Sequence, residues 1–286
     1  MISSLKTLFK HPYNQKRPFQ ALLRFTQWKF IRLLKIKNLT YSLWKDRKII
    51  ICYNSFQSMW VLYNYIIDWE EFNLIAKLVE PHDVVFDVGA NIGVYTVWMS
   101  QFINQSGRIH AFEPDAENFQ KLENHISLNQ ITDRTTTNRI ALAEAAIDLF
   151  FTTMLDGENH ISNRQNNNNV KITAQSLDQY AKISPVDFIK YLKIDVEGFE
   201  LSVLKGAANL LKNKKILVIQ LEINKTLINS NTTVEELLNY LLQYGYQLCG
   251  YRTKENRVYP ITFSQERENY FAIANIDMVN SILEQK

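Results

Sequence analysis

The chain is predicted to fold as an α/β protein with a doubly wound, mostly parallel sheet of seven strands. Apolar runs alternate with helical patterns from residue 81 onward, one run at residues 84–88 ends in a glycine-rich turn, and carboxylic acids follow several runs. This alternation is typical of a parallel sheet with helices on both faces. A length of 286 residues suits one such domain with an extension.

Residues 1–80 are predicted to form an N-terminal extension that contains a helix and a short strand pair. Apolar residues at helical spacing predict a helix over Phe19–Lys37, and the apolar run Ile49–Tyr53 indicates one strand. A second helix over Asp68–Val79 is expected to lead into the first strand of the main sheet.

The charge of this extension differs from that of the rest of the chain. Residues 1–45 carry ten Lys or Arg and no acid, whereas residues 46–286 carry 22 basic and 29 acidic residues. Three interpretations of the basic segment are open: a helix packed on the fold with solvated lysines, a surface helix on anionic lipid, or a docking face for an acidic partner. A nucleic-acid partner is not expected, because no nucleic-acid-binding motif accompanies the cations.

The cysteine content and the apolar runs bear on the compartment. Cys52 and Cys249 are the only cysteines, and their spacing fits neither a disulfide framework nor a metal site. The sequence has no apolar run of 18 residues and no secretory signal pattern. We therefore expect a cytoplasmic protein, with peripheral contact at the inner membrane surface as an open alternative through residues 1–45.

Residues 81–286 are predicted to form the main domain. The apolar runs predict strands near residues 84–88, 109–113, 137–142, 189–195, 216–222, 246–251 and 270–274. Helical patterns lie near residues 93–104, 115–129, 176–182, 198–212 and 232–244. A polar loop at residues 153–170, which holds His160 and an asparagine run, interrupts this alternation and is expected to be functional or disordered.

The turn after the first strand is the strongest indication of a ligand site. Asp87 ends the strand, and Gly89 and Gly93 follow, with Asn91 between them. Gly89 is expected to let the backbone approach a ligand, and Asn91 tolerates a positive φ and offers an amide. A dinucleotide turn requires glycine where this chain has Asn91, so an adenosyl ligand without a pyrophosphate fits better. Tyr95, in the first helical turn, is expected either to reach this ligand or to pack.

A second acid supports nucleoside binding. Glu113 ends the second predicted strand, where nucleoside-binding α/β folds accept hydrogen bonds from ribose hydroxyls. A third cluster of acids, Asp195, Glu197 and Glu200, follows the strand near residues 189–195.

Together these segments resemble the FkbM-type family of S-adenosylmethionine-dependent methyltransferases. The matching blocks are Asp87–Thr96, Ala111–Asn118, Ser176–Tyr180 and Leu192–Ala207, within about residues 80–225. The resemblance implies a Rossmann-like class I methyltransferase domain that uses S-adenosylmethionine to methylate a hydroxyl of a sugar, a glycan or a secondary metabolite. It also places Ala141, after the third strand, beside the adenine of the cofactor.

Asp195, Glu197 and Glu222 are the predicted catalytic residues. Asp195 and Glu222 each end a strand at the edge where ligands bind in such folds. Asp195 is expected to act as a general base with a raised pKa, or to bind Mg²⁺ together with Glu222. Glu200 is expected to favour the dipole of its helix, and Gly206 to let that helix pack closely on the sheet.

Two other functions remain open from the sequence. The fold could bind the cofactor without catalysis and serve as an interaction or membrane-adapter module through its basic segment. An NAD-dependent dehydrogenase is a further alternative, which the glycine pattern of the turn at residues 89–93 disfavours.

Overall fold

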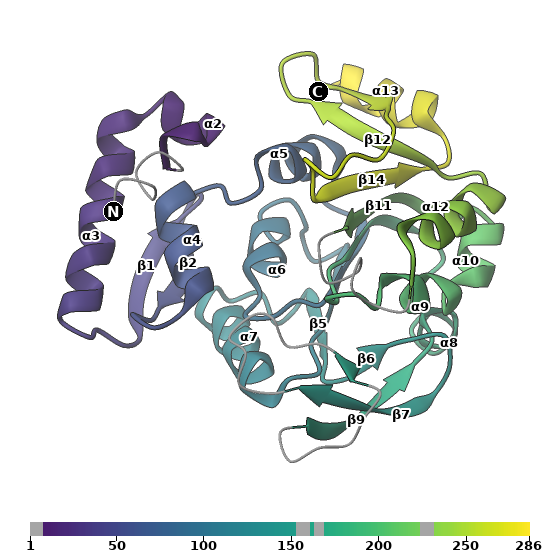
Figure 1. Cartoon of the computed structure of the whole chain (residues 1–286), viewed down its shortest axis with the longest axis horizontal. Coiled ribbons are helices and arrows are strands. Elements are labelled where there is room, and N and C mark those ends of the chain that lie inside the picture. The colour runs from purple at the N-terminus through teal and green to yellow at the C-terminus, as the bar shows by residue number, and fades with distance from the viewer. Residues whose placement is uncertain (1–7, 153–160, 163–168, 224–231) are drawn as a thin grey trace. The chain divides into compact units, whose positions relative to one another are not determined.

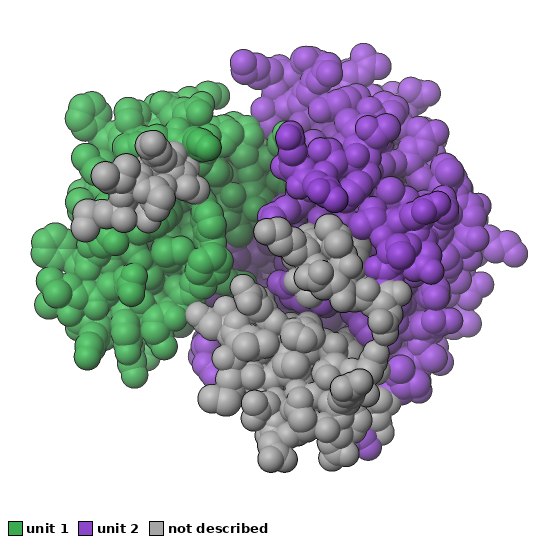
Figure 2. All heavy atoms as spheres, in the orientation of Figure 1, with its two compact units in different colours: residues 1–73 green, residues 74–286 purple. Residues whose placement is uncertain are grey.

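The computed structural model describes residues 8–152, 161–162, 169–223 and 232–286 (Figure 1). The chain divides into two compact units, residues 1–73 and residues 74–286 (Figure 2). The division falls within helix α5 (Trp69–Leu78), whereas the sequence suggested a boundary after residue 80. His160 and most of the asparagine run lie outside the described residues.

The first unit combines helices with an antiparallel hairpin. Before α5, its described elements are α2 (Pro12–Gln15), α3 (Pro18–Leu33), β1 (Leu39–Leu43), β2 (Arg47–Ile51) and α4 (Phe56–Asn64). Helix α3 begins at Pro18, whose fixed φ suits the first helical turn, and it stops before Lys35, which has a φ of 49°. The predicted helix is therefore confirmed but is shorter at its carboxyl end.

The second unit is built on an eight-stranded sheet with the order β13-β12-β14-β11-β10-β3-β4-β5. Its strands are β3 (Val84–Val88), β4 (Arg108–Phe112), β5 (Thr135–Asn138), β10 (Ile189–Ile194), β11 (Ile216–Glu222), β12 (Gln247–Arg252), β13 (Arg257–Pro260) and β14 (Asn269–Ile273). The strands from β11 to β5 are parallel, and β14, β12 and β13 are antiparallel to their neighbours. The mostly parallel sheet is confirmed. The sheet has one strand more than predicted. The short edge strand β13 was not predicted because its residues show no alternating apolar pattern.

The predicted third strand, residues 137–142, is two strands in different sheets. Strand β5 ends at Asn138, whose side-chain amide donates to the Ala111 carbonyl 3.1 Å away. The chain then enters a four-stranded sheet with the order β6-β9-β7-β8. Its strands are β6 (Ala141–Leu142), β7 (Ile147–Thr152), β8 (Ile161–Ser162) and β9 (Asn169–Gln175). The predicted polar loop at residues 153–170 therefore includes β8 and the start of β9.

Helices cover both faces of the large sheet (Figure 1). They are α6 (Val94–Met99), α7 (Ala116–Leu128), α8 (Leu177–Ile183), α9 (Glu200–Lys205), α10 (Ala208–Lys212), α12 (Val234–Gln243) and α13 (Ile276–Glu284). On one face, Phe86, Leu192 and Ile219 of the central strands are buried with apolar residues of α8, α9, α10 and α12. Side chains alternate between the faces of a strand, so Asp87 and Lys193 lie on the opposite face.

Gly206 ends helix α9, so the helix predicted over residues 198–212 is two helices, α9 and α10. A Cβ at this position would lie 2.1 Å from the carbonyl oxygen of Ala143, which follows β6. Glycine therefore lets the end of α9 approach the backbone of the neighbouring segment, and the predicted close packing is confirmed.

Candidate functional site

The carboxyl ends of four neighbouring parallel strands lie at one edge of the large sheet. In the strand register, Val88 pairs with Phe112 and with Ile194, and Ile194 pairs with Leu221. The residues that follow, Glu113 and Asp195, and Glu222 at the end of β11 therefore come to the same edge. Ligands of open α/β sheets bind at this edge.

The glycine turn after β3 adopts the backbone conformations that its residues permit. The φ angles of Gly89, Asn91 and Gly93 are 75°, 50° and 89°, so Asn91 adopts the positive φ that its residue type was expected to tolerate. Besides the predicted approach to a ligand, glycine at position 89 has a reason within the protein. Its Cβ would lie 1.8 Å from the carbonyl oxygen of Asp195, so glycine is required by the neighbouring turn of the protein itself.

Glu113 joins the glycine turn to the end of β4. Its carboxylate accepts hydrogen bonds from the backbone N–H of Asn91 at 2.7 Å and of Asp115 at 2.8 Å. The side chain is buried, and this burial raises the pKa of Glu113 to about 7, against the two backbone hydrogen bonds, which lower it. Within the described part of the chain each oxygen accepts one hydrogen bond, so the ionised side chain keeps a lone pair on each oxygen for a bound ligand.

Asp87, at the other side of the turn, is fully buried and holds protein groups. Its Oδ2 accepts a hydrogen bond from the Thr96 hydroxyl at 2.6 Å, in the first turn of α6. Its Oδ1 lies 3.4 Å from the Lys193 ammonium. Asp87 therefore fixes the start of α6 against the sheet.

Lys193 is a central residue of the site that the sequence reasoning missed. It lies on β10, directly between Asp87 on β3 and Gln220 on β11 in the strand register. Its ammonium is 3.2 Å from Asp195 Oδ2 and donates to the Gly89 carbonyl at 3.0 Å. The available signal was a pair of lysines, Lys190 and Lys193, in a strand whose other residues are apolar or aromatic, because a buried lysine needs an opposite charge.

The surroundings of Lys193 keep it charged. Burial alone would lower the pKa of Lys193, but the carboxylates of Asp195 and Asp87 raise it above its ordinary value. The ammonium also lies 4.9 Å from the centre of the Tyr95 ring. The Tyr95 hydroxyl accepts from the Gln220 amide at 2.9 Å, so Tyr95 is buried in the same network, where it packs against the sheet.

Asp195 faces the edge of the site with about a third of its side chain exposed (32%). Its burial favours a raised pKa, but the Lys193 ammonium and a hydrogen bond with Glu222 hold the pKa of Asp195 below its ordinary value. This is opposite to the raised pKa expected for a general base. The side chain is a carboxylate at neutral pH and can accept a hydrogen bond from a hydroxyl.

The geometry does not support the expected Mg²⁺ site. Lys193 already supplies a cation beside Asp195, and it also interacts with Glu222. Among the residues that the structure describes, no three His, Cys, Asp or Glu side chains are grouped to hold a metal ion.

Glu200 organises the turn between β10 and α9. Its Oε1 accepts from the backbone N–H of Gly198 at 3.1 Å and of Val196 at 3.3 Å. Within this turn, Glu197 has a positive φ of 52°, and Gly198 one of 96°. Glu200 is the first residue of α9, so it has the predicted dipole role and also fixes the backbone on which Asp195 lies.

We expect Glu200→Gln to reduce the loss of stability that accompanies a rise in pH. Burial raises the pKa of Glu200 to about 7 from 4.5. Because the pKa of this acid is higher in the folded state than in the unfolded state, its contribution to stability is complete below pH 4.5 and is lost as the pH rises through 7. The free energy of unfolding falls by at most about 3 kcal/mol over this range. Urea unfolding at pH 5 and pH 8 measures the difference. An equal pH dependence in Glu200→Gln and wild type would contradict the burial of this carboxyl.

Ala141, predicted to flank the adenine, lies in β6 at the border of the second sheet. It is buried and pairs with Ala174 of β9. The apolar residues around it include Ala143 and Phe199, and Phe199 precedes α9. Ala141 therefore contributes to the packing between the second sheet and the turn that carries Asp195.

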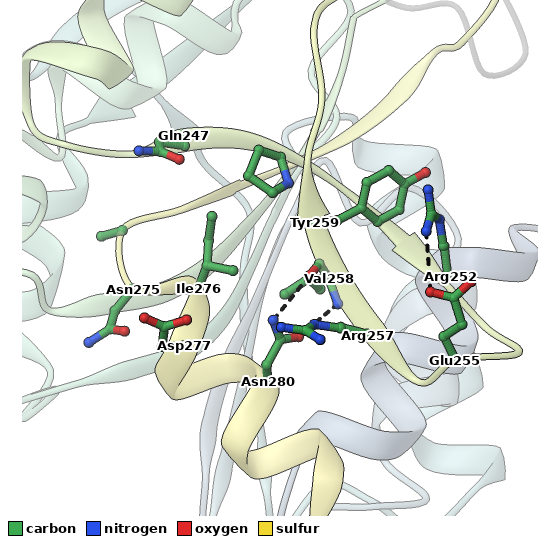
Figure 3. A pocket seen from close by; sticks show the side chains of 12 residues that line it. Gln247, Arg252, Glu255, Arg257, Val258, Tyr259, Asn275, Ile276, Asp277 and Asn280 are labelled. Carbon is green, nitrogen blue, oxygen red and sulfur yellow. Dashed lines mark hydrogen bonds and ion pairs between the residues drawn. The ribbon is translucent and has the colours of Figure 1, made fainter.

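A hollow of about 660 Å³ lies elsewhere in the second unit, between β13 and α13 (Figure 3). Arg252 pairs with Glu255 at 3.2 Å, and Asn280 exchanges two hydrogen bonds with the Val258 backbone. Ala274, which follows β14, also lines the hollow, and β14 runs antiparallel to β11. The hollow therefore lies toward the opposite edge of the sheet from Glu222, and its polar groups hold the edge strand.

Known proteins similar to this chain were identified by sequence. The family model described as "Methyltransferase FkbM domain" matches residues 87–248, more than half of the chain. The hexuronic acid methyltransferase AglP of Haloferax volcanii is 25% identical over 167 residues, which cover 58% of this chain and 67% of that protein.

Two solved structures with a similar fold are methyltransferases. Methyltransferase FkbM from Methylobacillus flagellatus is 18% identical with a TM-score of 0.45, and the match covers 87% of this chain and 58% of that one. The S-adenosylmethionine-dependent O-methyltransferase of Thermotoga maritima is 13% identical with a TM-score of 0.39, and the match covers 71% of this chain and 62% of that one. The chain thus spans less than two thirds of both.

Proposed function

The chain belongs to the FkbM methyltransferase family, and on this premise we propose that it transfers a methyl group from S-adenosylmethionine to a hydroxyl of a sugar or glycan. The main domain is a class I methyltransferase domain, and the family makes the chain a methyltransferase. S-adenosylmethionine as the methyl donor and a sugar or glycan hydroxyl as the acceptor are proposed from the residues of the site and from one relative of the chain.

The observation that carries the proposed donor is the position of Glu113. Its carboxylate lies at the end of β4, beside the glycine turn after β3, and it keeps one free lone pair on each oxygen. Two vicinal ribose hydroxyls match these two acceptors. The missing glycine at Asn91 argues against a pyrophosphate ligand, so a nucleoside sulfonium fits this turn better than NAD does.

The residues of the site support transfer to an oxygen. When bound, S-adenosylmethionine supplies a methyl group on a positively charged sulfur. The acceptor oxygen forms the new O–CH₃ bond as the S–CH₃ bond breaks, the electron pair of that bond stays on sulfur, and the hydroxyl proton must leave. Asp195 can accept a hydrogen bond from the hydroxyl and so orient an oxygen lone pair toward the methyl carbon.

Lys193 is proposed as the residue that positions Asp195. The ion pair at 3.2 Å holds the Asp195 carboxylate. The Lys193 ammonium also donates to the Gly89 carbonyl, which links Lys193 and Asp195 to the glycine turn after β3. Because Asp195 has a lowered pKa, it accepts a hydrogen bond from the acceptor hydroxyl but does not keep the proton, which passes to water. Glu197, in the same turn, is proposed to contact the acceptor.

The sugar acceptor is supported by the name of one relative. AglP of Haloferax volcanii is a hexuronic acid methyltransferase, and its similarity covers 67% of that protein. The identity of 25% supports a carbohydrate as the class of acceptor.

We expect calorimetry to detect binding of S-adenosylmethionine and none of NAD. Glu113→Ala should weaken this binding by up to about a hundredfold, because a hydrogen bond to a charged group contributes about 1.5–3 kcal/mol. The matched control is Glu117→Ala, which removes an exposed carboxylate on α7 that is paired with Lys121. Equal affinity in wild type and Glu113→Ala would remove Glu113 from the ribose role.

Turnover then separates an enzyme from a cofactor-binding adapter. Formation of S-adenosylhomocysteine with hexuronic acids or their glycans, and not with buffer alone, is the expected result. Cofactor binding without turnover on any hydroxyl acceptor would favour the non-catalytic alternative, and NAD binding would favour a dehydrogenase.

A further inference from the structure

Helix α3 of the first unit has two apolar faces. The buried face holds Ala21, Phe25, Trp28 and Ile31, at spacings of three and four residues. Phe25 lies 5.3 Å from the Tyr63 ring, so this face is fixed in the unit. The packing explains only half of the apolar residues that the helix carries.

The opposite face is apolar and exposed. Phe19, Leu23, Phe30 and Leu33 share it, because they follow one another at intervals of four, seven and three residues. Their exposed fractions are 88%, 59%, 63% and 75%. A helix that is apolar on both sides is typical of one buried on both sides, so the outward face requires a second apolar environment.

The exposed charges on and beside α3 are all positive, and they border the packed face as well as the outward one, since the Lys29 ammonium lies 5.1 Å from the centre of the Phe25 ring. Exposed cations precede the helix, lie on it and follow it: Lys16, Arg17, Lys29, Arg32, Lys35 and Lys37. No Asp or Glu occurs before Asp46, so the segment has no carboxylate of its own to pair with them. The complementary surface is therefore both apolar and anionic.

We propose that the outward face of α3 binds the surface of an anionic lipid bilayer. Sixteen helical residues extend about 24 Å, and Phe19, Leu23, Phe30 and Leu33 would enter the boundary between headgroups and acyl chains. The flanking lysines and arginines have long apolar stems and reach the phosphate groups. In the described part of the chain no helix has the length and apolar character to cross a membrane.

A bilayer fits these observations better than an acidic protein does. The apolar side chains project from a convex helix surface, and a flat, deformable layer can follow such a surface along its whole length. A segment of 45 residues without one acid suits a surface of uniform negative charge, whereas protein surfaces carry both signs. Buried Arg24, which donates to Asn14 at 2.6 Å, belongs to the packed face and takes no part.

Flotation of the full-length protein with vesicles tests the proposal. We expect binding to vesicles of phosphatidylcholine with 30% phosphatidylglycerol and much weaker binding to pure phosphatidylcholine. Salt at 0.5 M should reduce binding, because it screens the attraction between cations and phosphates. Lys29→Gln with Arg32→Gln should weaken binding roughly thirtyfold.

The apolar face is tested with a triple variant and a matched control. Phe19→Ser, Leu23→Ser and Phe30→Ser together should abolish flotation while leaving the affinity for S-adenosylmethionine unchanged. The control, Ile183→Ser with Leu242→Ser, removes two apolar side chains that are 79% and 61% exposed in the second unit, and it should float as wild type does.

A probe that needs no loss of apolar residues keeps the proposal testable if the triple variant misfolds. In a Cys52→Ser background, Leu23→Cys labelled with an environment-sensitive fluorophore should shift to the blue on anionic vesicles, and Leu242→Cys should not. Absence of flotation or of this shift would overturn the proposal. A wild-type dimer that the triple variant converts to a monomer without lipid would also overturn it, in favour of a second copy.

Discussion

Lys193→Met is expected to destabilise the protein by about 3–5 kcal/mol and to abolish cofactor binding. Removing one partner of a buried ion pair leaves the other charge uncompensated, and here two carboxylates, Asp87 and Asp195, lose their cation. The Gly89 carbonyl also loses its hydrogen-bond donor, so the glycine turn after β3 loses this link to β10. Urea unfolding and calorimetry with S-adenosylmethionine measure the two effects.

Lys190→Met is the matched control for this variant. Lys190 is a second buried lysine on β10, and it pairs with Asp83 at 3.6 Å near the amino end of the sheet. This variant should lose stability and keep its cofactor affinity, because Lys190 is remote from the glycine turn along the strand. If both variants bind the cofactor equally well, Lys193 is a structural residue only.

Asp195→Asn is expected to reduce methyl transfer by roughly 10²–10⁴-fold and to change cofactor affinity little. The amide keeps an oxygen for the Lys193 ammonium but loses the charge that orients the acceptor hydroxyl. Steady-state kinetics should show the loss in kcat at saturating acceptor, since an orienting contact acts at the transition state.

The control for Asp195→Asn is Asp187→Asn, at an exposed position before the amino end of the same strand. It should retain wild-type activity. Turnover within threefold of wild type in Asp195→Asn would remove Asp195 from catalysis. In that case Glu222, at the end of the neighbouring strand, becomes the next candidate for contact with the acceptor.

Several features of the second unit were predictable because they depend on local sequence. The apolar runs indicated the strands β3, β4, β10, β11, β12 and β14, and the positive φ of Asn91 followed from its residue type and place in the turn. The acids at strand ends were also predictable as a group at one edge, because parallel strands of one sheet end together. The short strand β13 escaped prediction, since four residues carry too little pattern.

The sequence by itself determined the fold class, the family and the edge of the sheet where the site lies. Only the tertiary structure decided what each site residue contacts: the Asp195 carbonyl beside Gly89, and the ammonium of Lys193 between Asp87 and Asp195. The reason is physical. Propensity and periodicity act over a few neighbouring residues, whereas these contacts depend on the register of strands that are about a hundred residues apart in the chain.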